Sequence, residues 1–284
     1  EVGDIHDATL TAVTRLGGQF GVETPVEDVA GGGLAGLFKN IAREFPELQV
    51  RVVDHASEAH PSEIAHSTIT EICTAGNVVE IGYRAGKRLQ IVSREEAVPE
   101  AAPPLDAVSQ GSVWLVTGGA RGVTAACARA FGKQYKLRLA LVGSTELVDV
   151  ESEWLHLNES GTKALKGRLM VEAKQRGEDP RRAWKAVEKT IEIRRSLAAF
   201  KAEGVEAYYF SCDLSDEEMV RQLVADVERQ VGPIRGIVHG AGYESACRFE
   251  KKTYAGFSAT VGPKALGLEY LLAATDQKIL GAVI

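Results

Sequence analysis

Short apolar runs alternate with helix-like segments along the second half of the chain. The predicted strands are SVWLVTG (112–118), LRLALVG (137–143), VEAYYFSCD (205–213) and IRGIVHGAG (234–242), and the first leads into a predicted helix, TAACARAFGKQY (124–135). Apolar strands that are each followed by a helix indicate a parallel sheet covered on both faces. We therefore predict an α/β fold with a doubly wound parallel sheet over residues 111–284, which would bind ligands at the carboxyl ends of its strands.

The same alternation occurs on a smaller scale in residues 1–94. A predicted strand at 9–16 is followed by a helix with apolar residues at helical spacing (Leu34, Leu37, Phe38 and Ile41), and an alternating strand follows Pro46. A helix over 62–73 and two paired strands, at 77–83 and 88–92, complete the block. This pattern predicts a smaller α/β subdomain that precedes the larger one.

Residues 95–110 separate the two blocks. They hold Pro99, Pro103 and Pro104 among small and acidic residues, a composition that disfavours regular structure. We predict that this segment is a linker.

An unusually long segment, residues 146–204, separates the second and third strands of the larger block. It contains predicted helices at 162–176 and 180–203, more than a single crossover helix requires. Between Lys163 and Lys201 there are twelve Lys or Arg residues and five Asp or Glu residues. We therefore treat residues 146–190 as a helical insertion, whose basic surface is either a solvated helical face or a docking site for an acidic partner.

The composition excludes several classes of protein. The chain has 284 residues, of which 45% are hydrophobic and 25% charged, as in ordinary globular domains. A net charge of −6 argues against general nucleic-acid binding. The sequence shows no signal peptide and no apolar run of about 18 residues, so we expect a cytoplasmic protein without membrane contact. The four cysteines are widely separated, which predicts reduced, apolar fillers and no metal site (Cys73, Cys127, Cys212 and Cys247).

The stretch WLVTGGARGVT (114–124) carries the strongest candidate chemistry. The predicted strand ends at Thr117, Gly118 and Gly119 begin a turn, Gly122 permits close approach of the backbone, and a helix begins near Val123. This arrangement presents free backbone N–H groups and the positive end of a helix dipole, which suit a pyrophosphate. A tight turn without a ligand is the alternative, but the strand and helix on either side favour dinucleotide binding.

The spacing TGGARGVT resembles the glycine motif of short-chain dehydrogenases and reductases, with Thr124 where a third glycine is usual. The resemblance implies a Rossmann-like fold in which three segments contact the cofactor. These comprise the glycine turn (Thr117, Gly118, Gly119, Arg121, Gly122 and Val123), the end of the third strand (Asp213 and Leu214), and the end of the fourth (His239, Gly240, Ala241 and Gly242). Asp213 would accept a hydrogen bond from the adenine amine. Its alternative role is to cap the next helix, which Ser215 or Asp216 could do instead.

HGAG followed by FSATVGPKALGLEYLL is similar to the ketoreductase domains of type I polyketide synthases and polyunsaturated fatty acid synthases. GGGLAGLFKNIAREFPELQVRVVD likewise resembles the structural subdomain that precedes their catalytic half, which we expect to be incomplete at its start in this chain. The resemblance implies hydride transfer to a β-ketoacyl thioester carried by an acyl carrier protein, beside other domains of the same synthase. It assigns Lys264, in a P-K-x-x-G setting, to the catalytic group that supports a proton-donating tyrosine.

The implied cofactor is NADPH, whose 2′-phosphate would meet Arg121 and Ser144. Arg121 is the basic residue of the glycine turn, and a guanidinium group suits phosphate. Ser144 ends the second strand where related ketoreductases often have arginine, and no acidic residue that would repel the phosphate follows before Glu146.

The resemblance fails at the catalytic serine and tyrosine, which should follow the fifth strand. The sequence ends at KILGAVI, where that strand would begin, so we expect a piece of a longer polypeptide. YRAGK (83–87) fits Y-x-x-x-K, but it precedes the glycine motif and its pattern predicts a hairpin turn, so we reject it. The alternatives are a non-catalytic cofactor-binding or scaffold domain of a synthase and a stand-alone short-chain alcohol dehydrogenase.

Overall fold

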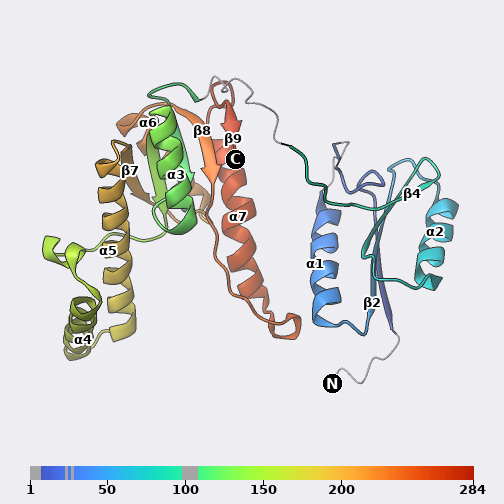
Figure 1. Ribbon diagram of the computed structural model, residues 1–284, viewed down its shortest axis with the longest axis horizontal. Coiled ribbons are helices and arrows are strands. Elements are labelled where there is room, and N and C mark those ends of the chain that lie inside the picture. The colour runs from blue at the N-terminus through green and yellow to red at the C-terminus, as the bar shows by residue number, and fades with distance from the viewer. Residues whose placement is uncertain (1–7, 23–24, 27–28, 98–107) are drawn as a thin grey trace. The chain divides into compact units, whose positions relative to one another are not determined.

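The computed structural model describes residues 8–22, 25–26, 29–97 and 108–284. Its internal contacts divide the chain into two compact units, Glu1–Pro99 with Cys247–Lys252 and Glu100–Ala246 with Thr253–Ile284. Most of the predicted linker at 95–110 lies outside the described residues. Each unit is a layered α/β structure, shown in Figure 1.

The first unit is built on a four-stranded sheet in the order β1-β2-β3-β4. Its elements are β1 (Thr9–Thr14), α1 (Ala30–Glu44), β2 (Gln49–His55), α2 (Pro61–Cys73), β3 (Glu80–Arg84) and β4 (Lys87–Leu89). The first three strands are parallel, and β3 and β4 form an antiparallel hairpin. Phe38 and Ile41 of α1 pack against Val52 of β2, and the smaller α/β subdomain predicted from the sequence has this architecture.

The predicted alternation of buried and exposed residues in β2 is wrong, because the strand is buried from Val50 to His55. β2 is a central strand with a helix on each face, so its polar residues also enter the interior. Arg51 donates to four backbone carbonyl groups, which satisfies its guanidinium group. Asp54 accepts hydrogen bonds from the Thr14 hydroxyl and from two backbone N–H groups. Hydrogen bonding therefore offsets the cost of burying these charges.

The rejected motif YRAGK forms the β3–β4 hairpin, as predicted. Ala85 and Gly86 are its two turn residues, both in the left-handed region with φ of 49° and 72°. The Tyr83 hydroxyl donates to the buried carboxylate of Glu71 at 2.6 Å. Burial is the largest cause that raises the pKa of Tyr83, followed by that hydrogen bond. This tyrosine is therefore a structural donor within the first unit.

The second unit is built on a five-stranded parallel sheet in the order β7-β6-β5-β8-β9. Its strands are β5 (Val113–Thr117), β6 (Arg138–Gly143), β7 (Glu206–Ser211), β8 (Ile234–His239) and β9 (Ala282–Val283). Its α-helices are α3 (Gly122–Tyr135), α4 (Glu159–Gln175), α5 (Pro180–Ala202), α6 (Glu217–Gln230) and α7 (Tyr254–Ala274). This is the doubly wound fold predicted from the sequence, and β9 lies within KILGAVI as expected.

The two faces of this sheet have separate cores. On one face, Trp114 and Leu141 pack with residues of α3 and α5, including Phe200. On the other face, Leu115 and Val142 pack with residues of α6 and α7. β6 and β7 are added on one side of β5, with α3 and α5 on one face of the sheet. After β7 the chain continues on the other face, and β8 and β9 are added on the other side of β5. In doubly wound sheets, ligands bind where the strand order reverses in this way, outside the carboxyl ends of the strands.

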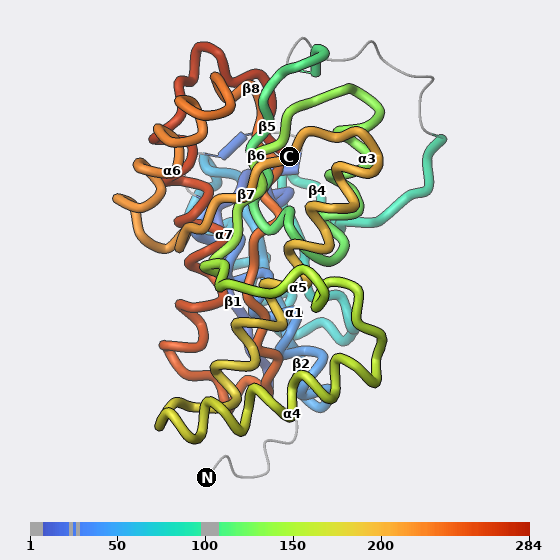
Figure 2. The backbone as a smooth tube through the Cα atoms, turned by 90° about the vertical axis from the view of Figure 1, so that its left-hand side faces the viewer, coloured from blue at the N-terminus to red at the C-terminus, as the bar shows by residue number. Residues whose placement is uncertain are grey.

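The long segment between β6 and β7 extends the crossover helix. The C-terminal half of α5 belongs to the sheet core through Ile193 and Phe200. Its N-terminal half packs with α4 around Leu165, Trp184 and Ile191, which form a small core of their own. Figures 1 and 2 show α4 beside the N-terminal part of α5. The predicted insertion at 146–190 therefore ends within α5, and no break in structure marks its boundary.

In the part of the chain that the structure describes, no helix has both the length and the apolar character needed to cross a membrane.

Candidate cofactor-binding site

The glycine turn joins the end of β5 to the start of α3. Gly118 and Gly122 have φ of +68° and +62°, which favours glycine. A Cβ atom on Gly118 would lie 2.6 Å from the carbonyl oxygen of Gly240. Among the residues that the structure describes, a Cβ atom on Gly122 would meet nothing within 4 Å, so glycine is needed there for its positive φ and not for lack of space. The turn therefore packs closely against Gly240, after β8, at Gly118. At Gly122, where α3 begins, there is space for a ligand.

Thr124 fills the position of the usual third glycine, and the structure shows how it is accommodated. A Cβ atom on Gly240 would lie 2.6 Å from Thr124 Cγ2 and 2.8 Å from its Oγ1. The missing side chain at Gly240 thus provides the room that Thr124 needs. The departure from the glycine motif is compensated within the HGAG segment.

A cavity of about 960 Å³ lies at the carboxyl ends of the strands, within the size range of cofactor pockets. The predicted site residues that line it are Gly118, Arg121, Gly122, Ser144, Asp213, Leu214, Gly240, Ala241 and Gly242. Those that do not line it are Thr117, Gly119, Val123, His239 and Lys264. Gly119 packs on Val116, and Val123 is largely exposed. The structure thus brings three segments, distant in sequence, around one space.

Thr117 and His239 do not line the cavity, but their hydrogen bonds hold the segments that do. His239 Nε2 lies 3.1 Å from the carbonyl oxygens of Pro263 and Lys264, so this nitrogen carries the proton and donates. Nδ1 then accepts from the Thr117 hydroxyl at 3.0 Å, and that hydroxyl accepts from the N–H of Ala241 at 3.1 Å. The imidazole therefore ties β5 and β8 to the helix that carries Lys264.

Asp213 lines the cavity, and another residue caps the next helix. Asp216 is the N-cap of α6 and accepts from the N–H groups of Glu218 and Met219. Asp213 accepts a local hydrogen bond from the N–H of Ser215 at 2.9 Å. Of the two alternatives considered for capping, Asp216 fills the role.

Cys212, beside Asp213, also lines the cavity. Burial is the main cause that raises the pKa of its thiol to about 11, with a smaller effect from Asp213. It is a neutral, buried thiol and not a nucleophile. The prediction of apolar fillers holds for Cys212, but Cys73, Cys127 and Cys247 are exposed.

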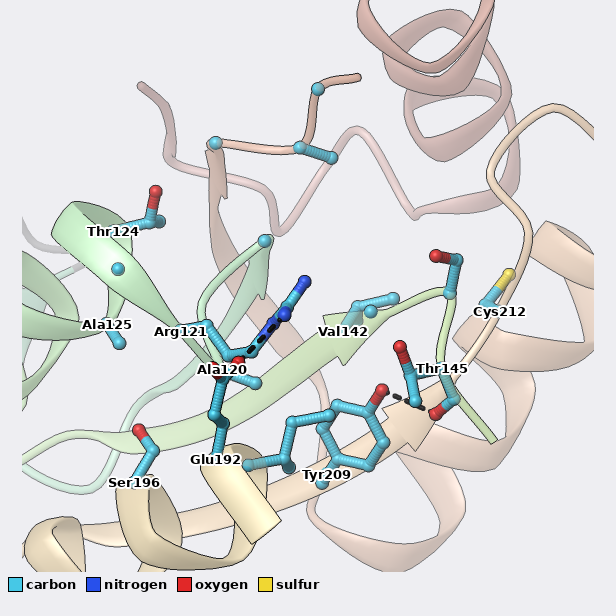
Figure 3. Close-up of a pocket in the computed structure, with 18 of the residues that line it drawn as sticks. Ala120, Arg121, Thr124, Ala125, Val142, Thr145, Glu192, Ser196, Tyr209 and Cys212 are labelled. Carbon is cyan, nitrogen blue, oxygen red and sulfur yellow. Dashed lines mark hydrogen bonds and ion pairs between the residues drawn. The ribbon is translucent and has the colours of Figure 1, made fainter. Parts of the chain in front are cut away.

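Sequence reasoning missed several lining residues that come from β7 and α5. They are Tyr209, Glu192, Arg195 and Ser196, together with Thr145 after β6. The Tyr209 hydroxyl donates to the carbonyl oxygen of Thr145 at 2.7 Å, as Figure 3 shows. Burial raises the pKa of Tyr209, so this phenol is a poor proton donor. No sequence motif marks these residues, since their place depends on the helical register of α5.

Arg121 forms an ion pair with Glu192, and both residues line the cavity. Arg121 Nη1 lies 2.9 Å from Glu192 Oε2, and both side chains are about half exposed (Figure 3). The sequence-based prediction considered acidic residues only as far as Glu146, two residues after Ser144. Glu192 is remote in sequence, and the crossover helix carries it to the glycine turn, so a carboxylate does stand beside Arg121.

Lys264 lies on α7, next to the HGAG segment. Its Nζ is 3.6 Å from Glu244 Oε1, and its side chain is about half exposed. A Cβ atom on Gly242 would lie 2.8 Å from Lys264 Cε. The absence of a side chain at Gly242 therefore leaves room for the lysine stem.

Comparisons with known proteins place the chain in a family. The model of the KR domain family matches residues 112–284. A polyunsaturated fatty acid synthase from Thraustochytrium sp. is 31% identical over 93% of this chain and 10% of that protein. Polyketide synthase PksL from Bacillus subtilis is 26% identical over 94% of this chain and 5% of that protein. The chain thus spans a tenth or less of the length of these curated relatives.

Solved structures agree on the fold. A structure of A-type ketoreductases from a modular polyketide synthase matches with a TM-score of 0.66 and 21% identity, over 97% of this chain and 50% of that one. A ketoreductase domain from the bacillaene assembly line matches with a TM-score of 0.61 and 20% identity, over 96% of this chain and 52% of that one. The resemblance stated from the sequence is confirmed, and the chain belongs to the KR domain family, the ketoreductase domains of polyketide and polyunsaturated fatty acid synthases.

Proposed function

We propose that this chain is the cofactor-binding part of an NADPH-dependent β-ketoacyl reductase. Its substrate would be a β-ketoacyl thioester on an acyl carrier protein, reduced to the β-hydroxyacyl thioester within a polyketide or fatty acid synthase. The observation that carries the proposal is the cavity at the strand ends, which the glycine turn, Asp213 and the HGAG segment line together in a KR-family chain.

The residues present fit a dinucleotide. Gly118 and Gly122 hold the turn open at the N-terminus of α3, where backbone N–H groups and the helix dipole favour a pyrophosphate. The carboxylate of Asp213 can accept from an adenine amino group, and Arg121 and Ser144 can donate to a 2′-phosphate. When bound, a reduced nicotinamide supplies the hydride.

Lys264 would supply positive charge beside the proton-donating tyrosine. A cation near a phenol lowers the phenol pKa, which makes proton donation at neutral pH easier. The ammonium group lies 3.6 Å from the carboxylate of Glu244, which is exposed. The proton-donating tyrosine that the family resemblance implies is not assigned to any residue of this chain.

Arg121→Gln is expected to weaken NADPH binding about tenfold to a hundredfold and to leave NADH binding within about twofold, because only NADPH has the 2′-phosphate that a guanidinium group binds. Equilibrium titration with both nucleotides measures the effect. Arg194→Gln is the control, since Arg194 is exposed on α5 and does not line the cavity. An equal loss for both nucleotides would show that Arg121 does not bind the 2′-phosphate.

Gly242→Ala is expected to lower kcat for ketoreduction about tenfold to a hundredfold, because the new Cβ atom displaces the Lys264 stem. The melting temperature should change little, since a flexible side chain can move away. Gly36→Ala is the matched control, because Gly36 lies in α1 and a Cβ atom there would meet none of the described residues within 4 Å. Unchanged kcat in Gly242→Ala would contradict the placement of Lys264.

The proposed reaction is tested with β-ketoacyl thioesters of an acyl carrier protein. The chain, and a longer synthase polypeptide that contains it, are incubated with NADPH, and loss of nicotinamide absorbance is followed. Reduction that depends on the glycine turn supports the proposal. Binding of NADPH without turnover in both samples would favour a non-catalytic cofactor-binding domain.

A further inference from the structure

Arg121 already has an anionic partner at the place where a 2′-phosphate would bind. The guanidinium group meets the carboxylate of Glu192 at 2.9 Å, and both residues line the cavity (Figure 3). The pair joins the glycine turn to α5. Any phosphate that binds Arg121 must therefore share this cation with a carboxylate or replace the carboxylate.

The position of Glu192 is fixed by its neighbours on α5. Ile191 is buried in the small core with α4, and Ile193 is buried in the core of the sheet. Thr190 is also buried and accepts a hydrogen bond from the N–H of Val148 at 3.2 Å. Because these residues set the rotation of the helix, Glu192 faces Arg121 as a consequence of packing.

Two arginines that also line the cavity have other partners. Arg195 donates to the carbonyl groups of Trp154, Leu155 and Leu157. Arg129 pairs with Glu203 at 2.9 Å. Lys189 lies near the pair: burial is the largest cause that lowers its pKa, the charge of Arg121 lowers it further, and the charge of Glu192 raises it. Arg121 is the cation that contacts Glu192 directly, at 2.9 Å, and it belongs to the glycine turn.

We infer that Glu192 is a specificity-determining residue that competes with the cofactor 2′-phosphate for Arg121. This inference rests on the proposed function, because it assumes that a nicotinamide dinucleotide binds here. With NADPH, the phosphate must displace a carboxylate and lie near its negative charge. With NADH, the ion pair stays intact. Glu192 therefore reduces the difference in affinity between NADPH and NADH.

The test is Glu192→Gln, with dissociation constants measured for NADPH and NADH by equilibrium titration. We expect NADPH binding to tighten about fivefold and NADH binding to stay within about twofold, since an exposed pair has a modest strength. High salt should reduce the gain, because it screens half-exposed charges. Glu178→Gln is the matched control: Glu178 pairs with Arg176 at 2.9 Å, is half exposed and lies outside the cavity.

The same substitution in the Arg121→Gln variant tests whether Glu192 and the 2′-phosphate compete for Arg121. In Arg121→Gln, adding Glu192→Gln should produce a smaller gain for NADPH than in the wild type, because only the repulsion between the carboxylate and the phosphate is then removed. An equal gain in both backgrounds would overturn competition for Arg121.

Two further outcomes would count against the inference, and they differ from a failure of the proposed function. If Glu192→Gln leaves NADPH binding unchanged or weakens it while the wild type binds NADPH, only the role of Glu192 is overturned. If the wild type binds neither nucleotide, the cofactor site itself is overturned.

Discussion

Gly118→Ala is expected to abolish measurable NADPH binding, with a dissociation constant raised at least about a hundredfold, because it deforms the turn that would hold the pyrophosphate. The new Cβ atom would stand 2.6 Å from the carbonyl oxygen of Gly240, and φ of +68° disfavours alanine. The atoms that it meets belong to the backbone and not to a flexible side chain, so the turn or the end of β8 must move. We expect the free energy of unfolding to fall by about 2–4 kcal/mol.

Nucleotide titration and urea denaturation measure the two effects of Gly118→Ala. Gly167→Ala is the control, because Gly167 lies within α4 and a Cβ atom there would meet no described residue within 4 Å. That change should keep NADPH binding intact and stabilise the helix by about 0.5–1 kcal/mol. Wild-type NADPH affinity in Gly118→Ala would contradict the role assigned to the glycine turn.

Lys264→Met is expected to lower kcat for β-ketoacyl reduction about a hundredfold to a thousandfold, with a smaller effect on the Michaelis constant for the thioester. Methionine keeps the apolar stem beside Gly242 and removes the charge. Without the cation, the phenol pKa rises and proton donation becomes harder. Steady-state rates in a synthase polypeptide that contains this chain measure the effect.

Lys278→Met is the control for Lys264→Met, since Lys278 is exposed and does not line the cavity. Its kcat should equal that of the wild type. If Lys264→Met also retained wild-type kcat, Lys264 would have no part in proton transfer and would be only a surface residue of its helix.

Hydrophobic pattern was sufficient to predict the doubly wound sheet. The runs that became β5, β6 and β8 are short, apolar and largely buried, and each ends at a polar residue or a glycine. The glycine turn was predictable for a related reason, because its conformation depends on residues adjacent in sequence. Even Asp216 as the cap of α6 was among the alternatives that the sequence offered.

What the sequence could not predict depends on contacts between distant residues. β2 was expected to alternate, but helices cover both of its faces and carbonyl groups from α2 and the following loop solvate Arg51. Glu192 was missed because the register of α5, set by two hydrophobic cores, brings it to Arg121. The compensation between Thr124 and Gly240 likewise requires β5 and β8 to be neighbours.

A crystal structure of this chain grown with NADPH tests the proposed cofactor site most directly. We predict the pyrophosphate at the turn formed by Gly118 and Gly122, the adenine beside Asp213, and the 2′-phosphate on Arg121 with Glu192 displaced. Electron density for the nucleotide elsewhere, or a cavity without nucleotide at saturating NADPH, would contradict the proposed site.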